Sequence, residues 1–369
     1  MEPRLPDSVD RRTALKLTGV AALAGLAGCS GDDDDGGNGN GNGNGNGNGN
    51  GNGNGNGNGN GNGNGNGNGN GNGNGNGNGN GDGEIIEWHA GGEGGTYFPL
   101  SNEFKTVVDD NTTHTLQVQS TGASVENVGS LSQEGADFAL IQNDIAFFAR
   151  NGTGIEAFEG NEIENLRGVA TLYPETIHII TQPGADIESV ADMEGMRVNT
   201  GDLGSGTQVN ALQILEAVAD LQPGDDFDEQ NTAFGPAADQ IRDGDVDAAF
   251  VVGGWPVGAV EELAETGDMG LLNLSDDELQ AALDAAEWFA EDTIPGGTYQ
   301  GIDDDVTTVS VQAMIATHTG VEADIVNEIT GTIFDNLDQL TLKTEFISRD
   351  SALDGMPIEL HGGAEGLFE

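Results

Sequence analysis

The stretch Ile85-Ile-Glu-Trp-His-Ala90, followed by the turn Gly91-Gly-Glu-Gly-Gly-Thr96, decides the fold class. A short apolar run that ends in glycines is typical of a strand, and the pattern over 97–108 is typical of a helix. The alternation of strand and helix continues over the segments 115–120, 124–134 and 138–142. Strand, helix, strand, helix and strand in this order predict a parallel α/β sheet.

The same order returns in the second half of the chain. A strand pattern at 196–200 leads into the turn Gly201-Asp-Leu-Gly-Ser-Gly-Thr207, and helix, helix and strand patterns follow over 208–220, 236–243 and 246–252. In each half an aspartate, Asp137 or Asp247, follows a glycine and precedes an apolar run. Two matching halves predict two similar lobes. Chance likeness between two strand–helix–strand units is the alternative.

Two extended segments join the halves. Residues 168–180 are typical of chain that passes from one lobe to the other, and the apolar stretch 307–317 can pass back. Two crossings predict a hinge, and a hinge between two lobes predicts a clamshell. On this interpretation lobe 1 comprises 84–175 and 300–369, and lobe 2 comprises 176–299.

The charge of the chain excludes one class of partner. Lys and Arg number 11 against 63 Asp and Glu, which gives a formal net charge of −52. Phosphate binding needs a basic footprint, so nucleic acid is excluded. High net charge is also typical of disorder, but apolar runs such as Ala248-Ala-Phe-Val-Val252 recur. An acidic surface over a normal core indicates adaptation to very high salt, where the Debye length falls to about 3 Å. We therefore interpret the source as halophilic, of haloarchaeal type.

The first 28 residues resemble an export signal. Arg11 and Arg12 precede the apolar run 17–27, which closes as Leu26-Ala-Gly-Cys29. Paired arginines before a short apolar segment resemble a twin-arginine signal, and Leu-Ala-Gly-Cys resembles a lipobox. The run is shorter than the roughly 20 residues of a membrane span, although a membrane anchor helix is the alternative. We expect cleavage before Cys29, lipidation of its sulfur and attachment to the extracellular face of the cell membrane.

Residues 29–83 predict a disordered tether. Four aspartates at 32–35 are followed by alternating Asn and Gly from Asn38 to Gly81. The repeat holds no apolar residue and so has nothing to bury. A flexible coil of about fifty residues reaches roughly 40 Å, so we interpret the segment as a spacer.

Three turns rich in glycine or hydroxyl residues precede predicted helices. A helix N-terminus presents unpaired N–H groups and a partial positive charge, so it holds an anion without a basic side chain. In an open α/β sheet such turns meet at the carboxyl ends of the strands. Plain helix capping by Ser and Thr is the alternative. The turns predict ligand contacts from Thr96, Tyr97, Thr121, Ser124, Gly204, Ser205, Gly206 and Thr207.

Further candidates follow the two strands that carry the repeated aspartates. Gln142 and Asp144 come after the first strand, and Gly254 and Trp255 come after the second. Gln142 and Asp144 can accept hydrogen bonds from an ammonium or a hydroxyl group, and Trp255 can stack or exclude water. Tyr173, at the entrance to the hinge, is similarly placed. A purely structural role is the alternative for each of them.

The motifs of enzymes and metal sites are incomplete. Thr207 follows Gly206 where a phosphate-binding loop needs lysine, and no Gly-x-Gly-x-x-Gly fingerprint follows a predicted strand. The five histidines are scattered without cysteine partners, which argues against zinc. Asp243-Gly-Asp-Val-Asp247 resembles the start of a calcium loop, but Ala248 replaces the required glycine. No nucleophile stands with a base. We expect no catalysis, no cofactor and no metal.

Several motifs together resemble the TAXI family of solute receptors, which serve tripartite ATP-independent periplasmic (TRAP) transporters. The matching segments run in order along the chain and cover it from Glu84 to the C-terminus. They are Gly94-Gly-Thr-Tyr-Phe-Pro-Leu100, Thr121-Gly-Ala-Ser-Val-Glu-Asn127, Ala139-Leu-Ile-Gln-Asn-Asp144, Ala170-Thr-Leu-Tyr-Pro-Glu175, Gly204-Ser-Gly-Thr207, Ile294-Pro-Gly-Gly-Thr-Tyr299 and Leu353-Asp-Gly-Met-Pro357. The resemblance implies the type II periplasmic-binding-protein clamshell.

The resemblance also implies a function. It is capture of a small organic carboxylate or amino acid, with glutamate-like compounds as leading candidates, and delivery to a TRAP-type permease. Trp255 departs from the smaller residue expected at its position and can narrow the pocket. A ligand-sensing surface lipoprotein without a transport role is the alternative. An enzyme of the same fold would need a catalytic constellation that the sequence does not offer.

Overall fold

One sheet runs through the part of the chain that the computed structural model describes, residues 83–368. Its strands follow the order β2-β1-β3-β10-β4-β7-β5-β6, with β8 paired to β4 and β9 paired to β10. The strands are β1 (Ile85–His89), β2 (Thr115–Gln119), β3 (Phe138–Gln142), β4 (Leu166–Thr181), β5 (Arg197–Asn199), β6 (Asp228–Gln230), β7 (Ala248–Gly253), β8 (Gly270–Leu271), β9 (Ala290–Ile294) and β10 (Val306–His318).

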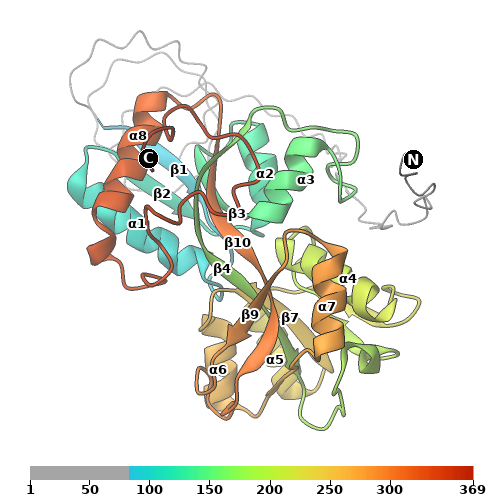
Figure 1. Cartoon of the computed structure of the whole chain (residues 1–369). Helices are drawn as coiled ribbons and strands as arrows, with labels where there is room; N and C mark the ends of the chain where they lie inside the picture. The colour runs from blue at the N-terminus through green and yellow to red at the C-terminus, as the bar shows by residue number, and fades with distance from the viewer. Residues whose placement is uncertain (1–82, 369) are drawn as a thin grey trace, which may run out of the picture. The chain divides into compact units, whose positions relative to one another are not determined.

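Helices fill the connections between these strands (Figure 1). Each end of the sheet is parallel: β1 pairs with β2 and β3, and β5 pairs with β6 and β7. The predicted α/β fold with alternating strands and helices is therefore confirmed. The helices are α1 (Tyr97–Asn111), α2 (Ser124–Ser132), α3 (Asn143–Asn151), α4 (Gly206–Ala219), α5 (Phe234–Asp243), α6 (Gly258–Thr266), α7 (Asp276–Ala285) and α8 (Ala323–Asp335), with short 3-10 helices at Val190–Met193 and Leu337–Gln339.

The two long strands β4 and β10 lie side by side and run from one lobe to the other (Figure 1). Along the first lobe, which holds β1–β3, α1–α3 and α8, β10 pairs with β3 and β4. In the second lobe, which holds β5–β7 and α4–α7, β4 pairs with β7 and β10 pairs with β9. These strands correspond to the two predicted crossing segments. The clamshell with two crossings that the sequence predicts is what the structure shows.

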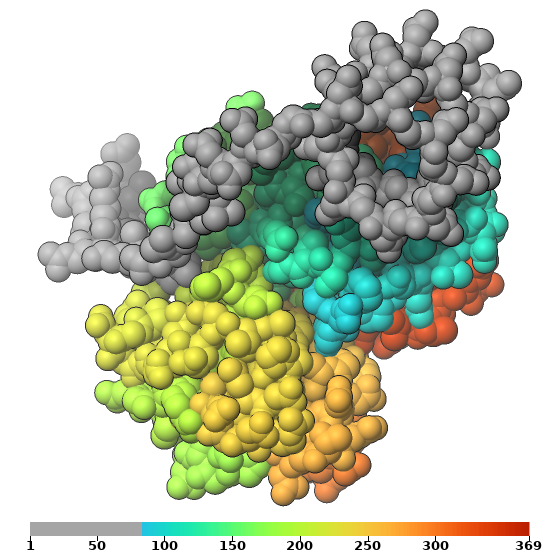
Figure 2. Space-filling model, turned by 180° about the vertical axis from the view of Figure 1, so that it is seen from behind, coloured from blue at the N-terminus to red at the C-terminus, as the bar shows by residue number. Residues whose placement is uncertain are grey.

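Each lobe has its own hydrophobic core. In the first lobe Trp88 is fully buried, stacks on Phe138 with ring centroids 5.5 Å apart and meets the edge of Phe104 at 5.8 Å. In the second lobe Ile177 and Phe250 are fully buried in a separate cluster. The strand β7, Ala248–Gly253, is buried at every position, as expected for a strand with helices on both faces. Figure 2 shows the two lobes from behind.

The repeated aspartates perform the same task in both lobes. Asp137 Oδ2 accepts a hydrogen bond from the backbone N–H of Glu87 at 2.8 Å, and Asp247 Oδ2 accepts one from Arg197 N–H at 2.9 Å. Each aspartate thus joins the start of its own strand to the first strand of its lobe. Equivalent bonds at equivalent places are a physical reason for the repeat in the sequence, beyond chance likeness.

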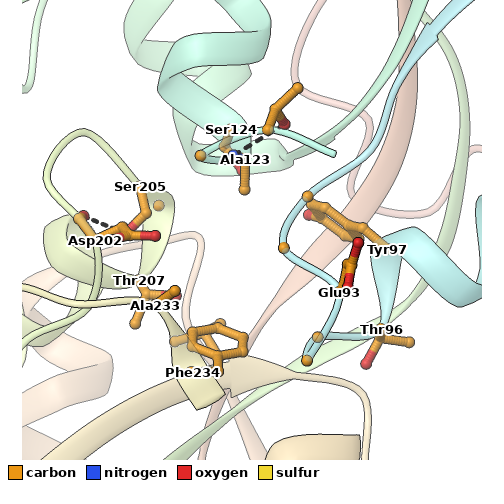
Figure 3. Close-up of a pocket in the computed structure, with 18 of the residues that line it drawn as sticks. Glu93, Thr96, Tyr97, Ala123, Ser124, Asp202, Ser205, Thr207, Ala233 and Phe234 are labelled. Carbon is orange, nitrogen blue, oxygen red and sulfur yellow. Dashed lines mark hydrogen bonds between the residues drawn. The ribbon is translucent and has the colours of Figure 1, made fainter. Parts of the chain in front are cut away.

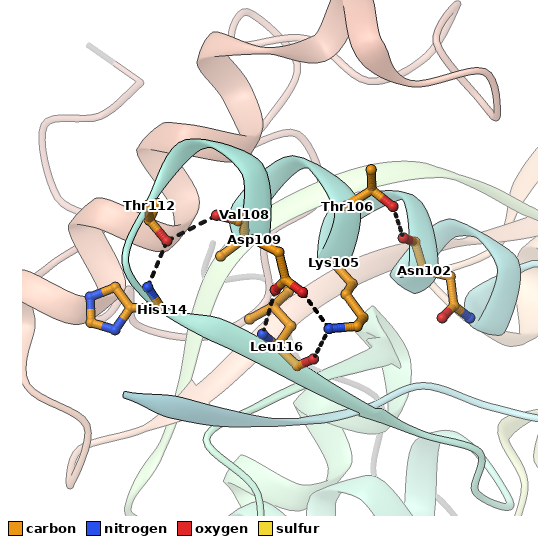
Figure 4. Close-up of polar contacts among 8 residues, drawn as sticks. All are labelled: Asn102, Lys105, Thr106, Val108, Asp109, Thr112, His114 and Leu116. Carbon is orange, nitrogen blue, oxygen red and sulfur yellow. Dashed lines mark hydrogen bonds and ion pairs between the residues drawn. The ribbon is translucent and has the colours of Figure 1, made fainter. Parts of the chain in front are cut away.

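A charged pair fixes the first helix to its neighbouring strand. Lys105 forms an ion pair with Asp109 one turn later on α1, and its Nζ donates to the Leu116 carbonyl of β2 at 2.8 Å (Figure 4). Asp109 Oδ1 accepts from Leu116 N–H at 2.9 Å. Helix α1 then ends at Thr112, whose hydroxyl donates to Val108 O and accepts from His114 N–H. These contacts hold the C-terminal half of α1 against β2.

The predicted signal segment, the lipobox with Cys29 and the tether up to residue 82 lie outside the described residues. Between residues 83 and 368, no helix is long and apolar enough to cross a membrane.

Candidate ligand-binding cavity

A cavity of about 300 Å³ lies between the two lobes. Four turns form most of its wall, and all four follow parallel strands at their carboxyl ends. Two belong to the first lobe, at 91–97 and 121–124, and two belong to the second, at 202–207 and 233–236. Figure 3 shows Tyr97 and Ser124 on one side, with Ser205, Thr207 and Phe234 opposite. The strand order thus brings segments far apart in sequence to one site, as expected for ligand sites in open α/β sheets.

Each of the four turns leads directly into a helix. Helices α1, α2, α4 and α5 begin at Tyr97, Ser124, Gly206 and Phe234, and these residues all line the cavity. The first N–H groups of a helix have no partner within it and carry the positive end of the helix dipole. Four such ends around one cavity favour an anionic group inside it.

The start of α4 shows which N–H groups are available. Ser205 Oγ accepts from Gln208 N–H at 3.1 Å and donates to Asp202 O at 2.7 Å, the second of these drawn in Figure 3. Val209 N–H then bonds to Ser205 O at 3.4 Å. Within the described chain, the N–H groups of Gly206 and Thr207 have no such partner. The Ser205 hydroxyl therefore caps the helix, and the two unpaired N–H groups beside it belong to residues that line the cavity.

Most of the residues predicted from the sequence meet in this cavity. The predicted turns at 94–97, 121–124 and 204–207 all contribute to the wall. The lining includes Thr96, Tyr97, Thr121, Ser124, Gln142, Ser205, Gly206 and Thr207.

Two predicted residues, Gly204 and Asp144, do not line the cavity but stabilise segments next to it. Gly204 has φ of +75°, a conformation that favours glycine, and its N–H donates to Gln208 Oε1 at 3.0 Å. Asp144 is fully buried at the start of α3, where its Oδ2 accepts from Asn210 Nδ2 at 2.7 Å. Burial raises the pKa of Asp144 to about 6, and the hydrogen bond from Asn210 opposes this rise.

Three further predicted residues form a layer behind the cavity. A Cβ on Gly254 would lie 2.8 Å from the ring of Tyr173, so these two residues pack directly against each other. The Gly254 carbonyl accepts from Thr96 Oγ1 at 3.2 Å. Trp255 packs edge-on against Phe346 with ring centroids 6.0 Å apart, and its carbonyl accepts from Lys343 Nζ. Tyr173, Gly254 and Trp255 thus support the wall and are not part of the lining.

Sequence reasoning missed several residues of the wall. Asp202 and Glu93 border it, and so does the turn that opens α5, where Phe234 stands two residues before the predicted helix start at Pro236. Glu175 is the most informative of them. It lies on β4, only 3 % exposed, and lines the cavity. The sequence offered no sign of this, because a single glutamate in an apolar strand pattern is ordinarily assigned to the solvated face.

Glu175 has an unusual electrostatic environment. Burial raises the pKa of Glu175 to about 8, while the neighbouring Tyr173 side chain and the charge of Lys343 oppose the rise. Its Oε1 is buried and has no hydrogen-bond partner in the described chain, and the same holds for the hydroxyl of Tyr97 beside it. Burial and the nearby Glu175 raise the pKa of Tyr97 well above its ordinary value. Buried polar atoms without partners are rare and require an explanation.

The two lobes contact each other on both sides of the cavity. Gln142 Nε2 in the first lobe donates to Asn210 Oδ1 in the second at 3.1 Å, and Asn210 also donates to Asp144. On the other side, Ala259 N–H donates to Gly94 O at 3.0 Å. These bonds bring the lobes together around the cavity.

No cluster of three or more metal-binding side chains occurs among residues 83–368.

Several solved structures resemble the chain at low sequence identity. A structure described as R. palustris Rpa4515 with adipate is 13 % identical, covers 69 % of this chain and 83 % of its own, and gives a TM-score of 0.47. The alkanesulfonate-binding protein SsuA from Xanthomonas axonopodis pv. citri, bound to MOPS, is also 13 % identical, with coverages of 71 % and 80 % and a TM-score of 0.42.

A TctC solute binding protein from Polaromonas is 17 % identical, with coverages of 75 % and 89 % and a TM-score of 0.38. The model of the NMT1-like family matches residues 89–369, which include every turn of the cavity and both crossing strands. The chain therefore belongs to the NMT1-like family.

Proposed function

We propose that the chain is an extracytoplasmic solute-binding receptor for a small organic carboxylate or amino acid, with glutamate-like compounds as leading candidates. The observation that carries this proposal is the cavity between the lobes, lined by four helix N-termini. Such a site binds a carboxylate through backbone N–H and hydroxyl groups.

The acidic surface requires that binding depend on local donors. With a formal net charge of −52 the long-range field repels an anion. High salt screens this field within a few ångströms, about 3 Å at about 1 M, while hydrogen bonds inside the cavity are screened much less. We therefore include a high-salt habitat in the proposal. The affinity for the anionic solute should fall when the salt concentration is lowered, because the repulsion is then less screened.

Delivery to a TRAP-type permease is the second part of the proposal. It is supported by the resemblance of seven segments to the TAXI receptors, among them Gly94-Gly-Thr-Tyr-Phe-Pro-Leu100 and Gly204-Ser-Gly-Thr207. The lobe boundaries, 84–175 with 300–369 and 176–299, belong to the same proposal. Co-purification of the receptor with a permease encoded beside it would support transport, and a neighbouring sensor kinase that responds to the same solute would contradict it.

The experiment for the site is titration calorimetry on Thr207→Val in molar salt. The solute is first identified by native mass spectrometry of the purified chain. A hydrogen bond to a charged group contributes about 1.5–3 kcal/mol, so loss of the hydroxyl should weaken binding about tenfold or more. Thr106→Val is the control, because Thr106 is exposed on α1 and bonds only to Asn102 O. Equal affinity of Thr207→Val and the parent would refute a solute contact by the Thr207 hydroxyl at the start of α4.

Attachment is a separate part of the proposal. Leu26-Ala-Gly-Cys29 and the paired arginines support twin-arginine export followed by lipidation of Cys29. Cys29→Ser should release the receptor into the medium or leave it unprocessed, which fractionation and immunoblotting can detect. A mature-sized, membrane-bound Cys29→Ser protein would exclude anchoring through this sulfur.

A further inference from the structure

The charged side chains that line the cavity are all acidic, and the positive potential in it comes from the backbone at the helix N-termini. Glu93, Glu175 and Asp202 line it, and no Lys, Arg or His is among the described residues of the lining. Burial raises the pKa of Asp202 above its ordinary value, and the nearby Glu126 adds to the rise. A solute that carries only carboxylate groups has no positive charge with which to offset repulsion by these acidic side chains.

Glu175 Oε1 is buried without a hydrogen-bond partner in the described chain. The nearest buried cation is Lys343, which donates to the Trp255 carbonyl and lies 6.0 Å from the centre of the Trp255 ring. No ion pair joins Lys343 to Glu175 within 4.0 Å in the described chain. Glu175 Oε1 and Tyr97 Oη are both buried, both belong to residues of the cavity wall, and both lack a hydrogen-bond partner there. The two oxygen atoms therefore form an acceptor site that the protein itself does not fill.

We propose that Glu175, with the Tyr97 hydroxyl beside it, accepts the protonated amine of the bound solute, and so selects amino acids over carboxylates without an amine. The inference rests on the proposed function and assigns each end of the solute. The carboxylate lies at the helix N-termini, and the ammonium lies at Glu175. An ammonium is a donor of three hydrogen bonds, which suits the unpaired acceptors.

Proton release is a consequence of this assignment. The titratable groups that act on Glu175 are Tyr173 on the same strand, Lys343, Asp144 on α3 and Tyr97 on α1. With a pKa of about 8, Glu175 is mostly protonated at neutral pH in the empty cavity. An ammonium favours the carboxylate form and lowers that pKa. Binding near neutral pH should therefore release a proton, and affinity should rise as the pH rises toward 8.

The first arm of the test uses matched solutes and the full chain in molar potassium chloride. The probes are L-glutamate and 2-oxoglutarate, L-leucine and 4-methyl-2-oxopentanoate, and adipate, each titrated by calorimetry. We expect at least one amino acid to bind about tenfold or more tightly than its 2-oxo partner. Calorimetry in two buffers of different ionisation enthalpy should then show proton release at neutral pH.

The second arm compares Glu175→Gln with Glu265→Gln. Both changes remove one carboxyl group, but Glu265 is exposed on α6 and away from the cavity. Glu175→Gln should weaken the amino acid about tenfold or more and abolish proton release, while Glu265→Gln should bind like the parent. Equal binding of a 2-oxo acid or adipate by the parent would overturn the amine assignment and leave the receptor function standing. Binding of none of the five probes would count against both.

Discussion

A single buried hydroxyl joins three segments of the second lobe. Tyr299 Oη accepts from Val257 N–H at 2.9 Å and lies 2.8 Å from His178 Nε2. His178 Nδ1 lies 3.0 Å from Thr176 O. Because the Thr176 carbonyl can only accept, Nδ1 of the neutral imidazole carries the proton, and Nε2 accepts the hydrogen bond from the Tyr299 hydroxyl. The imidazole is neutral in this arrangement, and burial lowers the pKa of His178 to about 4.

At this scale we predict that Tyr299→Phe destabilises the protein. The change leaves the Val257 N–H and His178 Nε2 buried without partners, and an unsatisfied buried group costs about 1–3 kcal/mol. The free energy of unfolding from urea titration should fall by about 2 kcal/mol or more. Tyr173→Phe is the control, because the Tyr173 hydroxyl is buried and has no partner in the described chain. Equal loss in the two variants would contradict the hydrogen-bonded role of Tyr299.

At the scale of elements, the close approach of α4 to β3 decides how the cavity closes. A Cβ on Gly206 would lie 1.6 Å from Gln142 Oε1, so any side chain at this position forces the Gln142 side chain to move before the two lobes can meet here. The clash is with a side chain of the opposite lobe.

Gly206→Ala should therefore weaken solute binding about tenfold or more while leaving the fold intact. Shortening the opposite side chain should relieve the clash, so Gly206→Ala combined with Gln142→Ala should bind like Gln142→Ala alone. Calorimetry on the parent, both single variants and the double variant gives the coupling energy. Additive losses would show that Gly206 does not act through Gln142.

The elements also show what the sequence could and could not reveal. The segments predicted at 168–180 and 307–317 correspond to β4 and β10, because long apolar runs with β-branched residues have few other stable arrangements. The start of α5 was placed at Pro236 instead of Phe234, since proline suits the first turn of a helix and gives no sharper boundary. The short strand β8 and the exposed strand β9 had no clear apolar pattern to reveal them.

The parts of the site that backbone turns form could be predicted from the sequence, and the part that depends on burial of a side chain could not. Glycine and hydroxyl turns before helices pointed to Thr96, Ser124 and Thr207, which do meet in the cavity. Glu175 was missed because its burial comes from strands and turns that are distant in sequence. Trp255 follows a strand end, as predicted, but it packs against Phe346 and the core of the second lobe and is not among the residues of the wall.

At the scale of the whole molecule, Asn210 connects the lobes. It accepts from Gln142 and donates to Asp144, so one side chain makes two bonds across the cavity. We predict that small-angle scattering of the parent shows a smaller radius of gyration when solute is added. Asn210→Ala should bind about tenfold more weakly or worse and need correspondingly more solute for the same compaction, because the bond from Gln142 contributes about 0.5–1.5 kcal/mol and the bond to the Asp144 carboxylate about 1.5–3 kcal/mol. An unchanged radius of gyration, with binding shown by calorimetry, would contradict closure about the hinge.

The position of β10 between β3 and β4 has a consequence for synthesis on the ribosome. Strands β1 to β4 are translated long before β10 (Val306–His318). Because β10 lies between β3 and β4, these two strands have no hydrogen-bonded neighbour between them until β10 has been made. Until then β3 presents an open edge, which is a template for pairing with other chains. The strands β5 to β7 and the helices between them emerge in one block and can fold earlier. The lobe that is begun first is therefore completed last, after nearly the whole polypeptide has been made.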